Sequence, residues 1–288
     1  MTALAATVIL PTTGDRGPVL RHSVASVLAQ TIGDLELFVI GDGVTPETRD
    51  VVADLVAQDP RVRFVDRPKH QRRGEPYRHE VLSEQASGSV VAYVCDRDLW
   101  LPNHLEELTR CLGAADFAHT LRFWIDDQDQ YVFTQRTDLT GADRDRSVRE
   151  PPVRPPGLVP LSFAGHTLDA YRRLPHGWRV TPAGTPTDRF MWTQFLDEPW
   201  VRVAHTATPT VLAFKRGNHP GLPTAERLAV LERWAPRVAD AAGRDAVQRE
   251  VQLALWLAWR DAEIRARRPR GRTWRSVPRA VRRRLGGR

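Results

Sequence analysis

Residues 6–30 read ATVILPTTGDRGPVLRHSVASVLAQ, an apolar run followed by a segment with helical periodicity. The opening run, ATVIL, is rich in β-branched side chains, which favours a buried strand. Between residues 19 and 28 the apolar side chains recur at the spacing of one helix face. The stretch therefore predicts a strand that passes through the turn-rich segment PTTGDRG into a helix.

The same alternation of strand and helix continues over about the first hundred residues. Thr45 followed by Pro46 is typical of a helix start. Strands that are almost wholly apolar and separated by helices indicate a parallel sheet covered on both faces. The fold class is therefore predicted to be α/β, with a Rossmann-like, mostly parallel sheet flanked by helices. Further strands are expected at 35–40, 62–65 and 90–94, and helices at 19–30, 46–58 and 77–86.

Polar residues follow three of the predicted strands. In sheets of this kind, ligands bind beyond the carboxyl ends of the strands. The three ends are Pro11-Thr12-Thr13, Gly41-Asp42-Gly43 and Asp96-Arg97-Asp98. The last closes VVAYVCDRDLWLP (90–102), where an arginine stands between two carboxylates. Carboxylates attract a cation and a guanidinium repels one, so this third end is anomalous for a metal site.

The pattern changes after residue 113. The segment FAHTLRFWIDDQDQYVF (117–133) predicts two strands joined by an acidic turn. Residues 135–160, which include EPPVRPPGLVP, are interpreted as a loop or lid-like segment. A helix is expected over 187–197, an extended segment over 201–214, and two helices within 223–264, and we predict α-helices at the C-terminal end of the domain.

Composition favours a globular protein, since 41% of the residues are hydrophobic and 27% are charged. A chain of 288 residues can form one large domain or two small ones. No apolar stretch of membrane-spanning length and no basic N-terminal region are present, so neither a transmembrane helix nor a signal peptide is expected. The two cysteines give neither a disulfide framework nor a zinc spacing. A cytoplasmic protein is the simplest interpretation.

The basic character of the chain is confined to its last residues. The segment RARRPRGRTWRSVPRAVRRRLGGR (265–288) contains eleven arginines and no acidic residue. Removing those eleven charges from the net +7 leaves residues 1–264 at about −4. Arginines interleaved with apolar residues suit an anionic membrane surface, which suggests peripheral contact with the inner face of the membrane. A solvated tail without a partner is the alternative. No nucleic-acid partner is expected, because no recognition fold accompanies the tail.

Two stretches together resemble the family 2 glycosyltransferases, which have the GT-A fold. They are VILPTTGDRGPVLRHSVASVLAQTIGDLELFVIGDGVTPET (8–48) and SGSVVAYVCDRDLWLPNHLEEL (87–108). That family opens with a strand ending in Pro-Thr and a helix ending in SVLAQT. A strand ending in Asp-Asp-Gly follows, and then a strand ending in an acidic DxD-type cluster. The resemblance covers residues 6–112 well and 160–215 loosely.

The resemblance implies transfer of a sugar from a nucleoside diphosphate sugar to an acceptor hydroxyl, with inversion at the anomeric carbon. Such a reaction needs positive charge for the departing diphosphate, a base for the acceptor proton, and a nucleotide held in position. The acceptor, a glycan, a lipid or a small molecule, is not specified. Two alternatives remain open: a nucleotidyltransferase, and a sugar-nucleotide-binding or scaffold protein of the same fold without catalysis.

For the nucleotide, the resemblance assigns Pro11, Thr12 and Thr13 to the nucleobase and Asp42 to the base or ribose. Gly41 stands where the family has a second acid. Arg78 matches an arginine that can fork onto a phosphate. Turn chemistry around the strand ends and a solvated helix arginine are the structural alternatives.

For the metal, the resemblance implies Mg²⁺ or Mn²⁺ at the acidic cluster, with His219 near the diphosphate as a further ligand. Asp96 and Asp98 would hold the cation if Arg97 turns aside. Alternatively, Arg97 itself neutralises the diphosphate and the enzyme is metal-independent, or the site no longer catalyses. A purely structural alternative has Asp98 capping the helix that begins near Pro102.

For the acceptor side, the resemblance assigns Asp188 as the general base, at the start of the helix over 187–197. A helix-capping role is its alternative. His166 and Trp192 are assigned to acceptor contact, and core packing is the alternative for both. The predicted units are a nucleotide-sugar half (1–112) and an acceptor half (113–218) within a GT-A-like domain (1–218), then a helical extension (219–264) and a basic tail (265–288).

Overall fold

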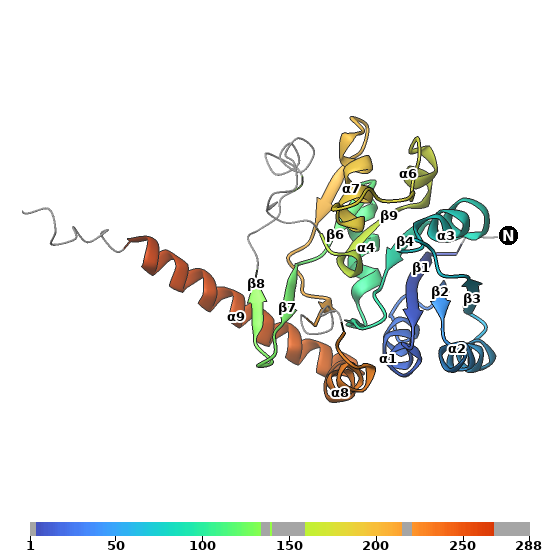
Figure 1. Ribbon diagram of the computed structural model, residues 1–288. Coiled ribbons are helices and arrows are strands. Elements are labelled where there is room, and N and C mark those ends of the chain that lie inside the picture. Colours follow the sequence, from blue (N-terminus) through green and yellow to red (C-terminus); the bar gives the residue numbers. More distant parts are fainter. Residues whose placement is uncertain (1–3, 134–138, 140–158, 215–220, 268–288) are drawn as a thin grey trace, which may run out of the picture.

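The computed structural model describes residues 4–133, 139, 159–214 and 221–267 (Figure 1). His219, most of the predicted loop at 135–160 and the tail from residue 268 lie outside the described residues. Predictions that depend on them stay predictions.

A seven-stranded sheet forms the centre of the molecule, in the order β10-β6-β9-β4-β1-β2-β3. Strands β1 to β4 are mutually parallel where they pair, and β9 runs antiparallel to both of its neighbours. The expectation of a mostly parallel α/β sheet is confirmed. The strands are β1 (Ala6–Gly14), β2 (Leu35–Val44), β3 (Val62–Arg67), β4 (Val90–Tyr93), β6 (Phe117–His119), β9 (Ala164–Thr167) and β10 (Val203–His205).

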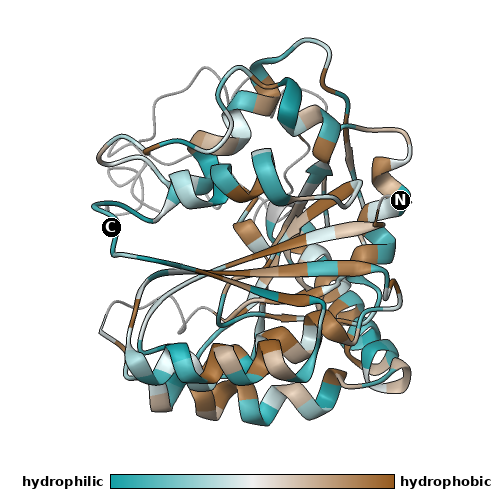
Figure 2. Ribbon diagram, turned by 90° about the vertical axis from the view of Figure 1, so that its right-hand side faces the viewer, coloured by the Kyte–Doolittle hydropathy of each residue, from teal (hydrophilic) through white to brown (hydrophobic). Residues whose placement is uncertain are grey.

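Helices cover the sheet above and below in the view of Figure 2. The Thr45 side chain accepts a hydrogen bond from the backbone N–H of Thr48, as its predicted capping role requires. The helix predicted at 77–86 is instead a short α-helix that passes into a π-helical turn, Val81–Gln85. The helices are α1 (Gly17–Leu28), α2 (Pro46–Gln58), α3 (Glu75–Glu80), α4 (His104–Leu112), α6 (Leu168–Arg173), α7 (Thr187–Asp197), α8 (Thr224–Trp234) and α9 (Ala241–Arg267).

The first two strands extend further than the apolar pattern predicts. They were expected to end near residues 10 and 40, but they pair as far as Gly14 and Val44, with a register shift after Thr12. Backbone pairing does not require apolar side chains, so the polar residues at these ends continue the sheet. Thr12, Thr13 and Asp42 are therefore held on rigid strands.

A second layer of structure packs against one side of the sheet domain. It contains the hairpin β7–β8 (Phe123–Ile125 and Tyr131–Phe133) and the pair β5–β11 (Leu99–Trp100 and Val211–Leu212). The hairpin has the predicted acidic turn, but the segment 117–133 holds three strands and not two, because its first strand, β6, belongs to the central sheet. Helix α8 packs on α1, and the first turns of α9 bury Val247 and Val251. The rest of α9 projects away from the body (Figure 1). Within the described residues no helix is both long and apolar enough to cross a membrane.

Candidate active site

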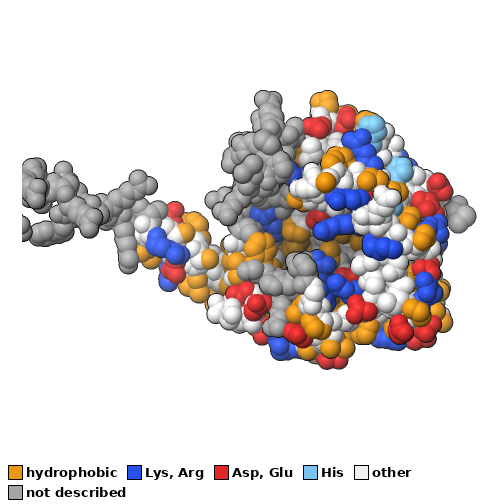
Figure 3. Space-filling model, viewed as in Figure 1, with side chains coloured by type: hydrophobic (Ala, Val, Ile, Leu, Met, Phe, Trp, Pro, Cys, Tyr) orange, Lys and Arg blue, Asp and Glu red, His pale blue; other side chains and the backbone are white. Residues whose placement is uncertain are grey.

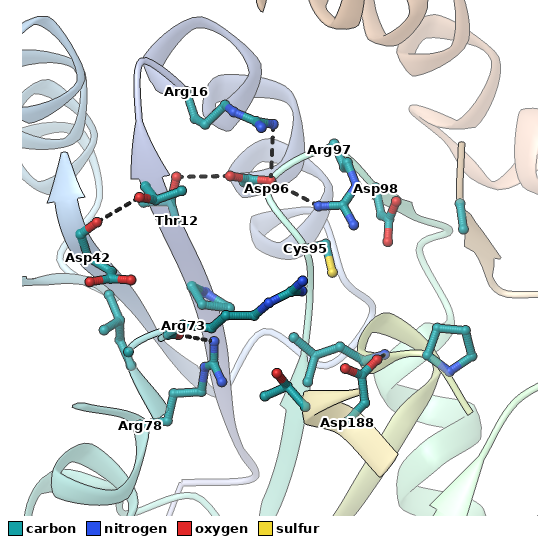
Figure 4. A pocket seen from close by; sticks show the side chains of 18 of the residues that line it. Thr12, Arg16, Asp42, Arg73, Arg78, Cys95, Asp96, Arg97, Asp98 and Asp188 are labelled. Atoms are coloured by element: carbon teal, nitrogen blue, oxygen red, sulfur yellow. Dashed lines mark hydrogen bonds and ion pairs between the residues drawn. The ribbon is translucent and has the colours of Figure 1, made fainter. Parts of the chain in front are cut away.

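A cavity of about 700 Å³ lies over the carboxyl ends of β1, β2 and β4 (Figure 4). The residues predicted to bind the nucleotide sugar come from separate parts of the chain, and all of them line this cavity. The base predicted from α7 lies in the wall of the same cavity. The predicted residues brought together here are Pro11, Thr12, Thr13, Asp42, Arg78, Asp96, Arg97, Asp98 and Asp188.

Asp42 fastens the segment after β3 to the end of β2. Its Oδ1 accepts a hydrogen bond from the backbone N–H of His70 at 2.5 Å, and its Oδ2 pairs with the ammonium of Lys69. The Thr13 hydroxyl donates to the Asp42 carbonyl at 2.7 Å. Both carboxylate oxygens of Asp42 therefore position the chain that brings Lys69 and Arg73 to the cavity.

Gly43 allows that segment to approach closely. Its φ of +67° lies in the left-handed region, and a Cβ there would be 2.5 Å from the Lys69 Cβ and 2.9 Å from its Cα. A side chain at Gly43 would be strained and would also push Lys69 away. Gly43 thus permits both the backbone conformation at the end of β2 and the close approach of Lys69 in the cavity wall.

Asp96 is enclosed by donors and cations of this chain. Its Oδ2 accepts a hydrogen bond from the Thr12 hydroxyl at 3.0 Å. Its Oδ1 lies 3.6 Å from Nη1 of Arg97 and 3.9 Å from Nη1 of Arg16. The side chain is buried, and the two guanidiniums approach it from different elements (Figure 4).

Asp98 is turned toward a neighbouring loop. Its Oδ2 accepts a hydrogen bond of 2.5 Å from the hydroxyl of Ser162, which lies in the 3-10 turn Leu161–Phe163. Burial raises the pKa of the Asp98 carboxyl, although Arg97 and the Ser162 hydroxyl act to lower it. The alternative of a helix cap is wrong, because α4 begins after Asn103 and has no side-chain cap.

Arginines dominate the other wall of the cavity. Arg78 is buried, with its guanidinium 4.8 Å from the centre of the Trp178 ring and its Nη2 donating to the Arg73 carbonyl at 2.8 Å. Its Nε and Nη1 have no hydrogen-bond partner among the described residues. Arg73 extends into the cavity beside Cys95 (Figure 4), and Figure 3 shows basic side chains around the hollow.

The positive charge around Asp96 exceeds what the sequence suggested. Burial acts to lower the pKa of Arg97, but Cys95, Asp98 and Asp96 outweigh it, so the pKa is raised and the guanidinium keeps its charge. Arg227, in the first turn of α8, interacts electrostatically with Arg16 and Arg97. Burial and then those two arginines lower its pKa.

The described residues do not fit a divalent cation at the Asp96–Asp98 end. Mg²⁺ at a nucleotide site is usually held by one or two carboxylates together with phosphate and water oxygens, but both carboxylates here already have partners within the chain. Two unit charges 4 Å apart interact by about 4 kcal/mol at an effective dielectric constant of 20. Two guanidiniums beside Asp96 would therefore repel a dication more strongly than that carboxylate attracts it.

Asp188 occupies the far wall of the cavity in the first turn of α7 (Figure 4). Its Oδ2 accepts a hydrogen bond from the backbone N–H of Leu161 at 3.1 Å. Oδ1 has no hydrogen-bond partner among the residues that the structure describes. The helix is not capped by a side chain, since its cap position is Pro186. The carboxylate is thus held by one oxygen, and the other oxygen is available to a ligand.

His166 and Trp192 lie in the core and do not line the cavity. Nε2 of His166 is 2.7 Å from the Tyr93 hydroxyl, and burial lowers the pKa of the imidazole to about 4. Trp192 is buried, and its indole N–H donates to the Val159 carbonyl at 2.9 Å. The acceptor contacts expected of these two residues have no support in their positions. Trp124 and Trp178 line the cavity in their place.

Several cavity residues were not predicted from the sequence. Arg16 follows the first strand within GDRGP, and Arg73 belongs to the run KHQRRGEP. The available signal for Arg16 was its position shortly after a strand end. For Arg73 it was the position next to Gly74, which precedes a helix. Ser162 lies between the cavity-lining residues Leu161 and Phe163 and gave no signal, because its role depends on a contact 64 residues away in sequence.

Known proteins share both sequence and fold with this chain. Residues 7–155 match the glycosyl transferase family 2 profile. An uncharacterized glycosyltransferase of Nostoc sp., alr2836, is 31% identical over 100 residues, a match that spans only 34% of this chain and 30% of that protein. The crystal structure of Staphylococcus aureus TarS 1–349 has a TM-score of 0.55 at 13% identity, covering 87% of this chain and 71% of that one.

The same TarS fragment in complex with UDP-GlcNAc gives a TM-score of 0.57 at 13% identity, covering 87% of this chain and 72% of that one. At this identity the likeness shows the fold alone, and it confirms the predicted GT-A-like architecture. The family profile spans more than half of the residues and includes the ends of β1, β2 and β4 that line the cavity. The predicted family is therefore confirmed: the chain belongs to glycosyl transferase family 2.

Proposed function

We propose that this chain transfers a sugar from a nucleoside diphosphate sugar to an acceptor hydroxyl, with inversion at the anomeric carbon. One observation carries the proposal: a single cavity has strand-end polar residues and arginines on one side and the carboxylate of Asp188 on the other. That arrangement supplies a place for the nucleotide, a positive region for the diphosphate and a base.

In this proposal, the ends of β1 and β2 bind the nucleoside. Pro11, Thr12 and Thr13 would meet the nucleobase and Asp42 the base or ribose, next to the segment that Asp42 itself anchors. The diphosphate would then extend toward Arg16 and Arg97. A guanidinium suits this task, because its planar fork donates two parallel hydrogen bonds to phosphate oxygens.

The chemical step is a single displacement. The acceptor oxygen forms a bond to the anomeric carbon while the bond from that carbon to the diphosphate oxygen breaks, and the bonding pair leaves with the diphosphate. Asp188 takes the acceptor proton, and the arginines stabilise the charge that develops on the leaving group. The acceptor oxygen attacks the anomeric carbon from the Asp188 side, opposite the diphosphate, and the anomeric configuration is therefore inverted.

Two tryptophans are candidates for contact with the sugar or the acceptor. The indole N–H of Trp124 has no hydrogen-bond partner among the described residues and is available to a ligand hydroxyl. The Trp178 ring lies beneath the Arg78 guanidinium. Aromatic faces of this kind pack on the apolar faces of sugars, with polar groups at their edges.

A donor screen tests the proposal. The chain is incubated with UDP-glucose, UDP-GlcNAc, GDP-mannose and dTDP-rhamnose, together with candidate hydroxyl acceptors, and release of nucleoside diphosphate is measured. We expect release from one of these donors and a loss of about 10²- to 10⁴-fold in Asp188→Asn, the usual contribution of a general base, with donor binding retained.

Asp169→Asn is the matched control. Asp169 is also the second residue of a helix, α6, but it is exposed and lies outside the cavity. Its replacement should leave release unchanged. Normal turnover in Asp188→Asn would remove Asp188 as the base, and the absence of binding to every donor and nucleotide would contradict the proposed function.

A further inference from the structure

We propose that the diphosphate of the donor is neutralised by arginines of this chain, chiefly Arg16 and Arg97, and that binding and transfer need no divalent cation. This inference rests on the proposed function, since it concerns the same cavity. It departs from the metal site that the DxD-type cluster suggested.

Asp96, the first carboxylate of the Asp96-Arg97-Asp98 cluster, already has partners within the chain. Thr12 satisfies its Oδ2, and its Oδ1 faces Arg97 and Arg16 at 3.6 and 3.9 Å. A metal bound to Oδ1 would have to stand beside two guanidiniums. Asp96 is instead placed to position those two guanidiniums for contact with the diphosphate.

Asp98 is also engaged within the chain. The Ser162 hydroxyl donates to it, and the same hydroxyl accepts from the backbone N–H of Cys95 at 3.0 Å. Asp98 is thereby bound to the 3-10 turn, away from Asp96 (Figure 4). The two carboxylates do not converge on a common point, as ligands of one cation would.

The cavity also presents buried guanidinium donors that are available to an anion. Nη1 of Arg16 and both Nε and Nη1 of Arg78 are buried and have no hydrogen-bond partner among the described residues. Buried donors normally have partners, so these donors point to a ligand rich in acceptor oxygens. A diphosphate has that chemistry, and Arg73 adds a further guanidinium from the opposite wall (Figure 4).

Calorimetric titration tests the inference. The full chain is titrated with UDP, GDP and dTDP, once in excess EDTA and once with Mn²⁺. We expect one nucleotide to bind with the same Kd under both conditions. Binding that requires Mn²⁺ would overturn the inference and leave the proposed function standing, whereas no binding under either condition would contradict the proposed function itself.

Two variants sharpen the test. Arg97→Asp restores an acidic triplet, so we expect binding in EDTA to weaken by about 10- to 100-fold, the loss of one charged hydrogen-bonding group, and Mn²⁺ to recover part of it. Arg16→Gln should weaken binding to a similar extent in EDTA and should not respond to Mn²⁺. Unchanged affinity in both variants would overturn the assignment of these arginines.

Arg21→Gln is the control. Arg21 is the arginine of α1 nearest to Arg16 in sequence. Its side chain pairs with the exposed Asp54 and does not line the cavity. We expect its Kd to equal that of the wild-type chain. Thermal unfolding of each variant is measured to check that the fold is retained.

A different observation supports a second inference, which is independent of the active site. We infer that the projecting part of α9, residues 253–264, binds an anionic lipid surface. It carries five of the seven exposed large hydrophobic residues found among the described residues. They are Leu253, Trp256, Leu257, Trp259 and Ile264, with exposed fractions of 59%, 52%, 36%, 60% and 49%.

The arrangement on α9 suits the boundary between lipid and water. Leu253, Leu257 and Ile264 fall on one side of the helix by their spacing, and Trp256 adjoins that side. The guanidinium of Arg260 lies 5.4 Å from the centre of the Trp256 ring. Apolar and aromatic side chains with nearby arginines bind the headgroup region of anionic membranes.

Charge favours a lipid surface over a second copy of the chain as the occupant. The residues that follow α9, 268–288, contain nine arginines and no acidic residue. A second copy of the chain carries the same arginine-rich segment and so offers that segment no opposite charge there. An anionic surface would instead attract both the segment and the helix, by about 1 kcal/mol for each basic residue near it.

Vesicle flotation distinguishes these occupants. The chain is mixed with vesicles of phosphatidylcholine alone or with 30% phosphatidylglycerol, where we expect binding only to the latter. Replacing both Trp256 and Trp259 by Ser should reduce the bound fraction at least about tenfold through lost apolar burial. Val180→Ser, which removes a side chain that is 51% exposed elsewhere, should have no effect.

Equal binding by the double tryptophan variant would mean that charge alone brings the chain to the vesicle, which overturns the role of α9. A stable dimer in light scattering that the double variant dissociates would also overturn the inference, in favour of a second copy as the occupant.

Discussion

The Ser162 hydroxyl donates a 2.5 Å hydrogen bond to Oδ2 of Asp98 and accepts one from the backbone N–H of Cys95. This pair joins the end of β4 to the 3-10 turn that precedes β9. The neighbouring residue of the turn, Leu161, donates its backbone N–H to Asp188. One short turn thus fixes a carboxylate of the acidic cluster and the candidate base relative to each other.

The relationship gives a prediction for Asp98→Asn. Burial raises the pKa of Asp98, so the folded chain holds a proton that the unfolded chain has already released. Ionised Asp98 therefore costs stability as the pH rises above its ordinary value of about 3.8, and the neutral amide removes that cost. We therefore expect Asp98→Asn to gain stability relative to wild type between pH 4 and pH 7, measured as a larger free energy of unfolding in urea titrations.

The same variant separates structure from metal binding. If Asp98 serves only to fasten the turn, Asp98→Asn should bind nucleoside diphosphate with unchanged affinity, since asparagine still accepts a hydrogen bond from Ser162. A large loss of affinity that depends on Mn²⁺ would show that the carboxylate holds a metal.

Gly43→Ala should damage both stability and nucleotide binding. A left-handed conformation costs a residue with a Cβ roughly 1–2 kcal/mol, and this Cβ would also collide with Lys69. We expect a lower melting temperature and weaker nucleotide binding. Gly184→Ala is the control, because its φ is +77° but no atom lies within 4 Å of the added Cβ. It should lose stability alone.

Arg78→Lys tests whether the guanidinium shape matters as well as its charge. Lysine cannot both donate to the Arg73 carbonyl and present a fork to a phosphate. We expect nucleotide affinity to fall by about tenfold or more, as for the loss of a charged hydrogen bond. Arg63→Lys is matched to it, since Arg63 stacks on Phe38 at 5.2 Å outside the cavity. Equal effects of the two variants would contradict a phosphate role for Arg78.

Two buried histidines should make the fold sensitive to acid. Burial lowers the pKa of His166 to about 4 and that of His104 to about 3. Their unfolded values lie near 6.5, so the unfolded chain binds protons that the folded chain does not, and stability is lost as the pH falls below 6.5. The slope should approach two protons, about 2.7 kcal/mol per pH unit, in urea unfolding between pH 6 and 4.5.

His166→Gln and His104→Gln identify the source of this slope. Each should reduce it by about one proton, although each also lowers stability at neutral pH by disturbing a hydrogen bond to Tyr93 or Thr210. A slope that neither variant changes would place the acid sensitivity in other groups.

Most of the nucleotide half could be predicted from the sequence because local patterns determine it. Apolar runs and helical periodicity placed β1 to β4 and their helices, and the rule for strand ends placed Thr12, Asp42 and Asp96 at one edge. The limits were set by contacts between distant residues. Strand β9 reads AGHT, too short for a pattern, and its pairing between β4 and β6 buries His166.

The chemistry of the acidic cluster could not be predicted for the same reason. The sequence showed Arg97 between two acids, but not that Arg16, just before α1, approaches Asp96 or that Ser162 binds Asp98. Both contacts depend on how β1 and the turn before β9 pack against the end of β4. Trp192 was similarly ambiguous, because an aromatic residue on a half-buried helix can face either the core or a ligand.

The most direct test of the account is one titration of the full chain with nucleoside diphosphates in EDTA, repeated with the Arg16→Gln variant. We expect saturable binding of one nucleotide at a single site by the wild-type chain, weakened by about 10- to 100-fold in the variant. No binding by the wild-type chain in EDTA, or equal binding by both proteins, would contradict metal-independent binding through Arg16.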